Sequence, residues 1–213
     1  MKKEKLTSRQ IKALDTKKAL FMSAIKLFKE KGFENVHIEE IAADAGTSKG
    51  SFYTYYKSKD EVIIEHYFRI DEHYISVYEK MDKNGSPSKM LATLFDSGFR
   101  FAEQLSVEFL KIVTINQVQK KHEDAYVISD QRKLHQIVLE IVLKGQKSGE
   151  FNEDIPAEEL STMVLCFYRG QFLDWCYTDG GFDLVERGNK FMKRFINNVL
   201  KNMSSNYTFD SIL

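Results

Sequence analysis

Proline is nearly absent from this chain of 213 residues, which contains only Pro87 and Pro156. Because proline interrupts helices, long stretches without it favour an all-α protein. The chain also lacks any apolar run long enough to span a membrane, and no apolar segment follows the lysines of its N-terminus. We therefore expect neither a membrane span nor a signal peptide.

Cysteine is equally scarce, and the two cysteines, Cys166 and Cys176, fall ten residues apart in one predicted helix. At the helical rise of about 1.5 Å per residue they lie roughly 15 Å apart, beyond the reach of a disulfide within the chain. We interpret both as core residues of a reduced, cytoplasmic protein rather than as a redox pair.

Motifs of catalysis are also missing. We find no pairing of a nucleophile with a base and no glycine-rich phosphate loop. His66 and His73 share one face of a predicted helix, but they are two turns, or roughly 10.5 Å, apart and cannot bind one metal ion together. The sequence therefore predicts no enzyme, no metal and no cofactor.

The net charge is zero, with 31 Lys and Arg against 31 Asp and Glu, but the two signs are unevenly distributed. Residues 1–60 carry 13 basic and 8 acidic residues, whereas residues 61–213 carry 18 and 23. A basic N-terminal third on an acidic body indicates that one end meets a polyanion. Chance fluctuation is the alternative explanation of the charge alone.

The spacing of apolar residues predicts a series of helices. The first long helix ends at Gly32, and it begins at Asp15 or Thr16 or runs back to Thr7. We expect a domain boundary after residue 58, which gives an N-terminal domain of residues 1–58 and a C-terminal domain of residues 59–213. The other expected helices cover 37–45, 49–55, 59–82, 87–104, 107–118, 124–147, 157–178 and 182–203.

The two short helices and the tight turn at Gly46 are typical of a helix-turn-helix unit packed on the first long helix. In such a unit the second short helix enters the major groove of DNA, N-terminal residues first. Gly50 would let the backbone approach DNA closely, and Lys49 could reach a guanine edge or a phosphate. Hydroxyl and phenol groups suit phosphate oxygens, and Lys59 begins the next helix, where free N–H groups favour a phosphate. The candidate contacts are Ser48, Lys49, Gly50, Ser51, Tyr53, Thr54, Tyr55 and Lys59.

Residues 19–63 resemble the N-terminal domain of the TetR (tetracycline-repressor-like) family of bacterial transcriptional regulators. The matching positions include Lys31-Gly32-Phe33, Ile41-Ala42, Ala45-Gly46, Ser48-Lys49-Gly50 and Lys57-Ser58-Lys59. The resemblance implies a homodimer that binds a double-stranded DNA operator, and it adds His37 to the candidate DNA contacts. His37 departs from the threonine usual at that position, which concerns the operator sequence rather than the DNA-binding role.

Aromatic side chains are numerous in the middle helices, with 16 Phe and 10 Tyr in the whole chain. An ordinary core explains most of them. The resemblance implies that some line a cavity in the C-terminal ligand domain, and an aromatic lining with few charges suits a small hydrophobic effector. The candidate lining residues are Tyr67, Tyr74, Phe95, Phe99, Phe109 and Phe167.

The last two predicted helices are apolar around most of their circumference. One face of each can pack on its own domain, and the other face needs a partner. Two such helices from each of two chains would form a four-helix dimer interface, as in the family. The candidate interface residues are Phe172, Trp175, Phe191, Phe195 and Val199.

Together these features predict a dimeric, ligand-responsive repressor with a helix-turn-helix domain and a larger helical ligand-binding and dimerisation domain. The helix that begins at Lys59 would link the effector site to the DNA-binding domain. Two alternatives stay open: a helical module that binds a small molecule or partner without sequence-specific DNA binding, and an architectural DNA-binding protein without a ligand.

Overall fold

The computed structural model describes residues 7–201, and every regular element in this range is helical, which confirms the all-α fold. The α-helices are α1 (Ser8–Lys31), α2 (Ile38–Asp44), α3 (Lys49–Tyr55), α4 (Lys59–Lys80), α5 (Pro87–Leu105), α6 (Val107–Val118), α7 (Lys133–Lys147), α8 (Ala157–Tyr177) and α9 (Leu184–Phe195). Short 3-10 turns lie at His122–Asp124 and Tyr126–Ile128, and a π-helical turn lies at Ile196–Leu200.

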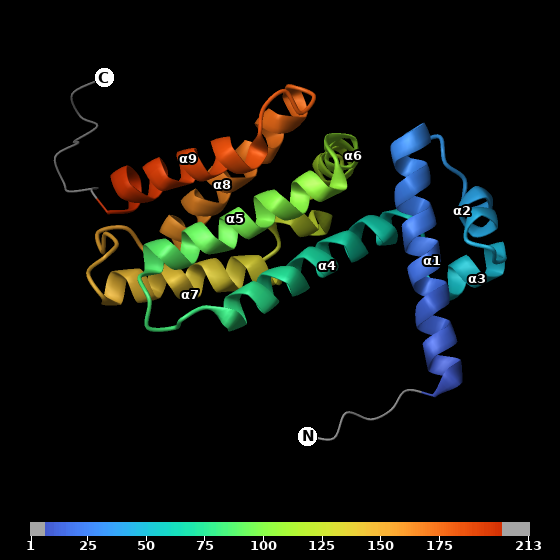
Figure 1. Ribbon diagram of the computed structural model, residues 1–213, viewed down its shortest axis with the longest axis horizontal. Helices are drawn as coiled ribbons and strands as arrows, with labels where there is room; N and C mark the ends of the chain where they lie inside the picture. The colour runs from blue at the N-terminus through green and yellow to red at the C-terminus, as the bar shows by residue number, and fades with distance from the viewer. Residues whose placement is uncertain (1–6, 202–213) are drawn as a thin grey trace.

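The molecule is elongated, with α1–α3 gathered at one end (Figure 1). We call these three helices the head and the remaining helices the body. Helix α4 leads from the head into the body, where it packs on α5 and α7, while α8 and α9 cover the opposite side. Helix α6 lies near the head and packs on both α1 and α8.

Helix α1 begins at a capping box. The Thr7 side chain accepts a hydrogen bond from the Gln10 backbone at 3.3 Å, and the Gln10 side chain accepts one from the Thr7 backbone at 2.8 Å. This reciprocal pair satisfies two amide groups that would otherwise lack partners. The helix therefore runs back to Thr7, which is one of the two starts that the sequence left open.

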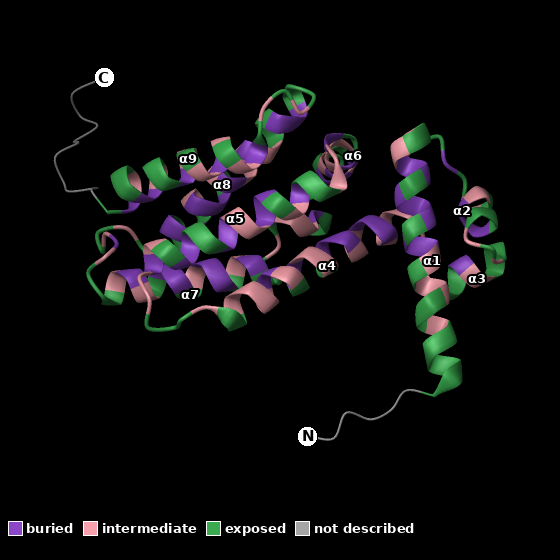
Figure 2. Cartoon of the chain, viewed as in Figure 1, coloured by how far each residue is buried: buried purple, intermediate pink, exposed green. Residues whose placement is uncertain are grey.

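The apolar core of the head extends beyond the three helices of the head. Leu20 and Phe28 of α1 and Phe52 of α3 belong to the same buried cluster as Val62 of α4 and Phe109 of α6. Figure 2 shows this continuity as buried residues on the facing sides of α1 and the start of α4. The division at residue 58 stays a proposal, and the packing couples the head to α4 and α6.

Helix α7 starts at Lys133, so the expectation of a helix from residue 124 was wrong. The apolar residues of 125–128 continue the helical pattern, but this segment forms 3-10 turns instead. The reason lies in α4, where the buried Asp71 accepts hydrogen bonds from Arg132 and Tyr126. These contacts hold the segment against α4 and delay the start of α7.

The last helix also departs from its expected range of 182–203. The α-helical part begins at Leu184 after the cap Asp183, whose side chain accepts a hydrogen bond from the Glu186 backbone at 2.7 Å. It ends at Phe195, and the chain continues as a π-helical turn to Leu200. Residues 202 and 203 lie outside the described range.

Candidate nucleic-acid interface

The turn between α2 and α3 fixes the geometry of the candidate interface. Gly46 has φ +65°, a left-handed conformation that favours glycine, and the Thr47 amide donates to the Ala42 carbonyl at 2.9 Å. Ile41 of α2 and Phe52 of α3 are fully buried between the helices and α1. The sequence thus folds here into the helix-turn-helix arrangement that it predicted.

Helix α3 presents its other side to solvent. The Ser48 hydroxyl caps the helix by accepting a hydrogen bond from the Ser51 backbone at 3.1 Å. Lys49, Tyr53 and Thr54 are exposed, and the Thr54 hydroxyl donates to the Gly50 carbonyl at 3.1 Å. The structure therefore brings six of the candidate DNA contacts, residues 48–51, 53 and 54, to one short helix and its cap.

Gly50 has no role that the fold itself explains. A Cβ atom built at this position would meet only the Ser48 hydroxyl oxygen, at 3.7 Å, which is ordinary van der Waals contact. Its φ angle does not require glycine, and the residue is exposed. The absence of a side chain instead keeps the surface of α3 open to close approach by another molecule.

The ammonium of Lys49 forms an ion pair with the carboxylate of Glu39, with 2.6 Å between Nζ and Oε1. The two side chains are 53% and 58% exposed, so solvent reaches both. The hydrogen bond from Lys49 lowers the pKa of Glu39, and the charge of His37 acts in the same direction. A carboxylate thus lies among the candidate DNA contacts, which the sequence reasoning missed.

His37 stands at the N-cap of α2 and is exposed. The Glu40 carboxylate accepts a hydrogen bond from the His37 backbone at 2.8 Å, and this contact is the main cause of the lowered pKa of Glu40. Glu40 also pairs with Lys31, which joins α2 to the end of α1. The His37 ring is therefore placed at the same edge of the head as Glu39.

Two tyrosines at the end of α3 face inward. Tyr55 is half-buried against the core of the head, and Tyr56 is buried, with its hydroxyl donating to Glu65 at 3.0 Å. Glu65 also accepts from Lys17 of α1 at 2.6 Å and from Arg69 at 2.7 Å. Burial raises the pKa of Glu65, but these hydrogen bonds outweigh burial and hold the pKa below its ordinary value. Glu65 thereby joins α4 to α1 and to the end of α3.

Lys59 has a different role from the phosphate contact expected from the sequence. Its ammonium donates to the carbonyls of Phe33 at 2.6 Å and Val36 at 2.9 Å, and it lies 4.7 Å above the centre of the Phe33 ring. A third carbonyl, that of Glu34, lies at 3.5 Å. The ammonium therefore closes the loop between α1 and α2, and its hydrogen-bond donors are directed into the protein rather than towards DNA.

Lys57, two residues earlier, is the exposed cation of this segment. Its backbone N–H donates to the Glu61 carboxylate at 2.7 Å, which orders the start of α4. Its side chain forms no ion pair with the residues that the structure describes. Lys57 belongs to the motif Lys57-Ser58-Lys59, which matches the family, but the sequence predicted no DNA contact for it.

The N-terminal part of the chain matches the family model described as "Bacterial regulatory proteins, tetR family" over residues 20–65. This match covers α2 and α3, the last part of α1 and the first turns of α4. Residues 20–65 are therefore similar to the DNA-binding domain of the TetR family. The chain is a DNA-binding transcriptional regulator, in agreement with relatives that are named regulators and align with most of its length.

Two curated relatives align with most of the chain. The fatty acid metabolism regulator protein of Bacillus subtilis is 23% identical over 83% of this chain and 92% of the relative. The transcriptional repressor BepR of Brucella suis is 23% identical over 88% of this chain and 93% of the relative.

Solved structures agree with the fold. FadR of Bacillus subtilis, solved with stearoyl-CoA, has a TM-score of 0.73 at 18% identity and covers 85% of this chain and 98% of its own. FadR of Thermus thermophilus, solved with lauroyl-CoA, has a TM-score of 0.66 at 20% identity and covers 90% of this chain and 99% of its own. At these identities the likeness shows the fold alone.

The six candidate effector-lining residues lie in two different clusters. Tyr67 and Phe109 belong to the core of the head, whereas Tyr74, Phe95 and Phe99 belong to the core of the body. Phe167 is half-buried and stacks on Phe195 with 4.4 Å between ring centres. The structure therefore does not bring the six together, and a shared effector site for them stays a prediction.

Aromatic rings fill the body core around Tyr168. Its ring lies 4.3 Å from that of Phe95 and 5.0 Å from that of Phe99, and its hydroxyl lies 2.8 Å from the Tyr74 hydroxyl. A Cβ atom at Gly98 would lie 1.9 Å from the Tyr168 hydroxyl oxygen, so this glycine is required by packing. Burial raises the pKa of Tyr74 to about 12 and keeps its hydroxyl protonated.

The described residues form, among others, two surface clefts. One, of about 510 Å³, lies between the end of α4 and the start of α5. The other, of about 660 Å³, lies where α1, α4 and the segment before α7 meet, and we call it the junction cleft. None of the six candidate effector residues lines either cleft. The junction cleft is lined by Lys17, Glu65, Phe68, Arg69, Asp71, Glu72, Ile75, Tyr126, Gln131 and Lys133.

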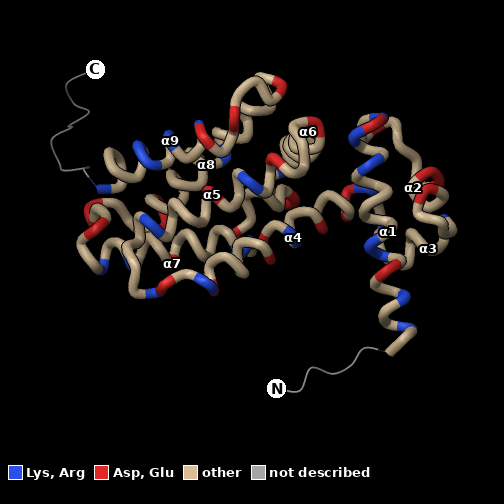
Figure 3. The backbone as a smooth tube through the Cα atoms, in the orientation of Figure 1, with Lys and Arg blue, Asp and Glu red and all other residues tan. Residues whose placement is uncertain are grey.

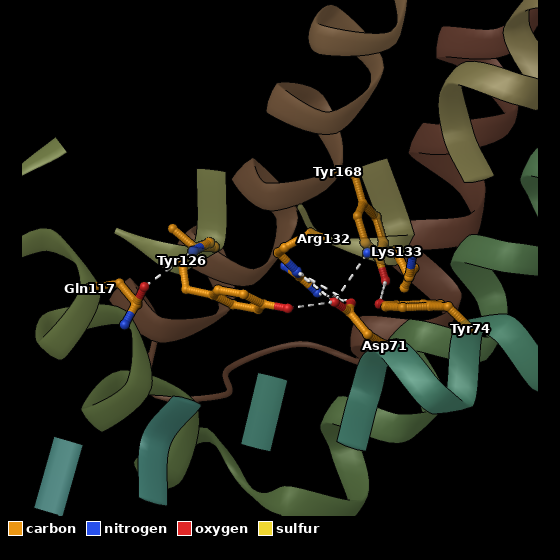
Figure 4. A network of polar contacts seen from close by, with 8 residues as sticks. Asp71, Tyr74, Gln117, Tyr126, Arg132, Lys133 and Tyr168 are labelled. Carbon is orange, nitrogen blue, oxygen red and sulfur yellow. Dashed lines mark hydrogen bonds and ion pairs between the residues drawn. The ribbon is translucent and has the colours of Figure 1, made fainter. Parts of the chain in front are cut away.

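Asp71, one of the residues that line the junction cleft, forms a buried ion pair with Arg132 (Figure 4). The side chains of Asp71 and Arg132 are only 4% and 6% exposed, and the Arg132 guanidinium donates to Asp71 at 2.7 and 3.2 Å. The backbone of Lys133 donates to the same carboxylate at 3.3 Å, and Tyr126 at 3.4 Å. Although burial opposes the charged form, Asp71 holds the pKa of Arg132 above its ordinary value. The network ties α4 to the start of α7.

The candidate dimer residues differ in where they point. Trp175 is 7% exposed and its indole donates to the Phe182 carbonyl at 3.0 Å within the same chain, so its place in a dimer interface stays a prediction. Phe172 also faces inward, 5.4 Å from the Phe99 ring and 4.9 Å from the Tyr168 ring. Phe191, Phe195 and Val199 are half-buried and stay candidates for the dimer interface.

Helix α8 carries an exposed stripe that the sequence reasoning did not identify. Leu173 is 38% and Tyr177 76% exposed, and Cys166 is exposed about two turns before Leu173 on the same face. A Cβ atom at Gly170 would meet nothing within 4 Å. The four-residue spacing from 166 to 170 and from 173 to 177 is the signal that a finer analysis of the sequence could have used.

The described part of the chain gives no support to a metal site or a membrane span. No group of three or more His, Cys, Asp and Glu side chains within residues 7–201 is arranged to hold a metal ion. None of the helices in the same range has the length and apolar character needed to cross a membrane.

Proposed function

We propose that this TetR-family regulator is a repressor that long-chain acyl-CoA molecules release from its operator. The observation that carries the DNA-binding part is the exposed side of α3, where Lys49, Gly50, Tyr53 and Thr54 stand free of the core. A short helix offered in this way fits the major groove of DNA.

The contacts we propose follow the geometry of the head. Lys49 would contact base edges, and Gly50 would allow the backbone to approach. Lys57 at the start of α4 would contact a phosphate, in place of the Lys59 side chain. The hydroxyl groups of Ser48, Ser51, Tyr53 and Thr54, the half-buried Tyr55 and the His37 ring complete the proposed set.

The effector class rests on the relatives. The relative from Bacillus subtilis is named for fatty acid metabolism, and two FadR structures with the same fold contain stearoyl-CoA and lauroyl-CoA. An acyl chain needs an apolar environment, and the body of this chain holds a large aromatic core. The anionic phosphates of CoA need cations, and Lys17, Arg69 and Lys133 lie around the junction cleft.

Helix α4 is the proposed connection between effector and DNA. Its first turns belong to the core of the head, Glu65 joins it to α1, and Asp71 joins it to α7. An acyl-CoA that moved the body around Asp71 would therefore tilt the head. Because half-sites for a dimer are about 34–36 Å apart or a multiple of that, a small tilt lowers operator affinity.

Dimerisation through α8 and α9 is part of the proposal. The support is the exposed stripe with Leu173 and Tyr177 on α8, together with the half-buried Phe191 and Phe195 on α9. A dimer places two copies of α3 on one duplex, which a pseudo-palindromic operator would match.

The test begins with an operator selected from a random duplex library by the full-length protein. Stearoyl-CoA is then added to the complex of protein and labelled operator, with free CoA and stearate as controls. We expect stearoyl-CoA alone to release the duplex, by at least about tenfold in Kd. Release by CoA or stearate alone would contradict the acyl-CoA proposal, and failure to select any duplex would contradict the DNA-binding proposal.

A further inference from the structure

Glu39 lies where a DNA-binding protein is least expected to hold a carboxylate. It is exposed at the start of α2, 2.6 Å from the ammonium of Lys49 and close enough to His37 for the two charges to interact. Helix α2, which carries three acidic residues, lies on the side of the head away from the body (Figure 3). Phosphates approaching this edge would meet a negative charge and a lysine that is already paired.

The other carboxylates of α2 have structural partners. Glu40 holds the His37 backbone and Lys31, and Asp44 pairs with Lys26 of α1 at 2.7 Å. Glu39 alone among the three pairs with a residue of α3. The Glu39 contact therefore does not fix α2 on α1. It acts on Lys49, the first residue of α3.

The proposal rests on the DNA-binding function argued above. We propose that Glu39 is a specificity-determining residue that, with Lys49, reads a G·C base pair in each half-site and masks Lys49 on all other DNA. In the major groove, guanine offers the acceptors O6 and N7, and its cytosine offers the N4 amino donor. A lysine and a carboxylate held side by side match these neighbouring groups.

Other DNA gives the pair no such match. A phosphate can accept from Lys49 but offers no donor to Glu39, so separating the pair there leaves a carboxylate near a polyanion. The pair therefore stays closed on non-specific duplex, and Lys49 releases no counterion from it. Glu39 in this way lowers non-specific affinity more than operator affinity, which is a repulsive route to specificity.

The experiment compares Glu39→Ala and Glu39→Gln with wild type on the selected operator and on a scrambled duplex over a range of salt. Both variants should bind scrambled duplex at least threefold more tightly. Freeing one lysine per protomer should steepen the log–log salt dependence by up to about 0.9 for each new phosphate contact. The ratio of operator affinity to scrambled affinity should fall by at least about fivefold.

Asp44→Asn is the matched control, because it removes one negative charge and one exposed lysine pair from the same helix. We expect it to change the ratio by less than twofold. A second arm replaces each G·C pair of the operator by A·T in turn. One replacement per half-site should weaken wild type at least fivefold and Glu39→Ala by a clearly smaller factor, because the variant has only the Lys49 contact to lose.

The outcomes separate the two proposals. Three results would overturn this inference alone. The ratio of operator affinity to scrambled affinity could stay unchanged in both Glu39 variants, or Asp44→Asn could change it equally. Finally, no G·C replacement in the operator could distinguish wild type from Glu39→Ala. If wild type bound scrambled duplex as tightly as the selected one, the proposed function would fail and this inference with it. Circular dichroism melts confirm that the exposed substitutions leave the head folded.

Discussion

Lys57 and Lys59 show how two neighbouring lysines take different roles. Lys57 is exposed without an ion pair among the described residues, whereas the Lys59 ammonium donates to carbonyls of the loop between α1 and α2. A lysine in contact with phosphate contributes to the salt dependence of DNA binding, and a lysine that closes a loop contributes to folding.

We therefore expect Lys57→Ala to weaken binding to operator and scrambled duplex alike and to flatten the log–log salt slope by roughly 0.9 per protomer. Lys59→Ala should leave the slope unchanged but lower the free energy of unfolding by about 1–3 kcal/mol, because hydrogen bonds from a charged group are lost. Salt titrations and urea unfolding of both variants check this. A flatter slope for Lys59→Ala with unchanged stability would contradict the assignment.

The sequence alone does not separate these two lysines, because both belong to the same Lys57-Ser58-Lys59 motif. Their roles depend on which direction the first turn of α4 gives each side chain, and that direction follows from packing against residues 33–36, which are distant in sequence. The orientation of Lys49, Tyr53 and Thr54 in α3, in contrast, follows from local helical spacing once Phe52 is buried.

At the scale of elements, the start of α7 was mispredicted because Tyr126, Val127 and Ile128 continue an apolar helical pattern. The partner that overrides this pattern is Asp71, and its position 61 residues before Arg132 is invisible to a local analysis. The same contact gives a stability prediction.

Arg132→Leu should lower the free energy of unfolding by about 3–5 kcal/mol, because it leaves the Asp71 carboxylate buried without its partner. The double variant Asp71→Leu with Arg132→Leu should recover at least about 1 kcal/mol of that loss, since the unpaired charge is gone. Urea unfolding at fixed protein concentration measures both. Equal stability of the single and double variants would show that the ion pair is not the source of the effect.

The exposed stripe of α8 predicts where the dimer can be broken. Leu173→Glu and Gly170→Arg should shift the protein to monomers and weaken operator binding by more than tenfold, since one head then binds without the other. Trp175 is unsuitable for this test because its substitution disturbs the core. Sedimentation at micromolar concentration provides the measurement, and an intact dimer in both variants would place the interface elsewhere.

At the scale of the whole molecule, the interior contains histidines that resist protonation. Burial, with a further contribution from the charge of Arg132, lowers the pKa of His66 to about 3 and that of His135 to about 4. The ordinary pKa is about 6.5, so below that pH the unfolded chain binds protons that the folded chain does not.

The folded protein should therefore lose stability as the pH falls from about 6.5 to 5.5, by roughly 1 kcal/mol for each of the two histidines. Above about pH 7.5 these groups should have no effect. His66→Gln should remove part of this dependence, and His122→Gln, at an exposed position, should not. Urea unfolding at pH 7.5, 6.5 and 5.5 measures it. A His66→Gln variant with the full dependence would contradict the neutral, buried state of this histidine.

Composition predicted an aromatic body but not how its rings are used. A core and the wall of a cavity need the same residues, and only the distances between rings distinguish them. Here Phe95, Phe99 and Tyr168 fill the space between α5 and α8. The acyl chain of the proposed effector would therefore have to separate packed rings or enter from a surface cleft, and in both cases its binding would change the body that packs on α4.

The measurement that tests this account most directly is the affinity for stearoyl-CoA with and without saturating operator. If operator and acyl-CoA favour different arrangements of the same molecule, each must lower the affinity of the other by the same factor. We predict that calorimetric titration with stearoyl-CoA gives at least about tenfold weaker binding in the presence of operator, matching the loss of operator affinity that stearoyl-CoA causes. Equal acyl-CoA affinity with and without operator would contradict the coupling between the body and the head.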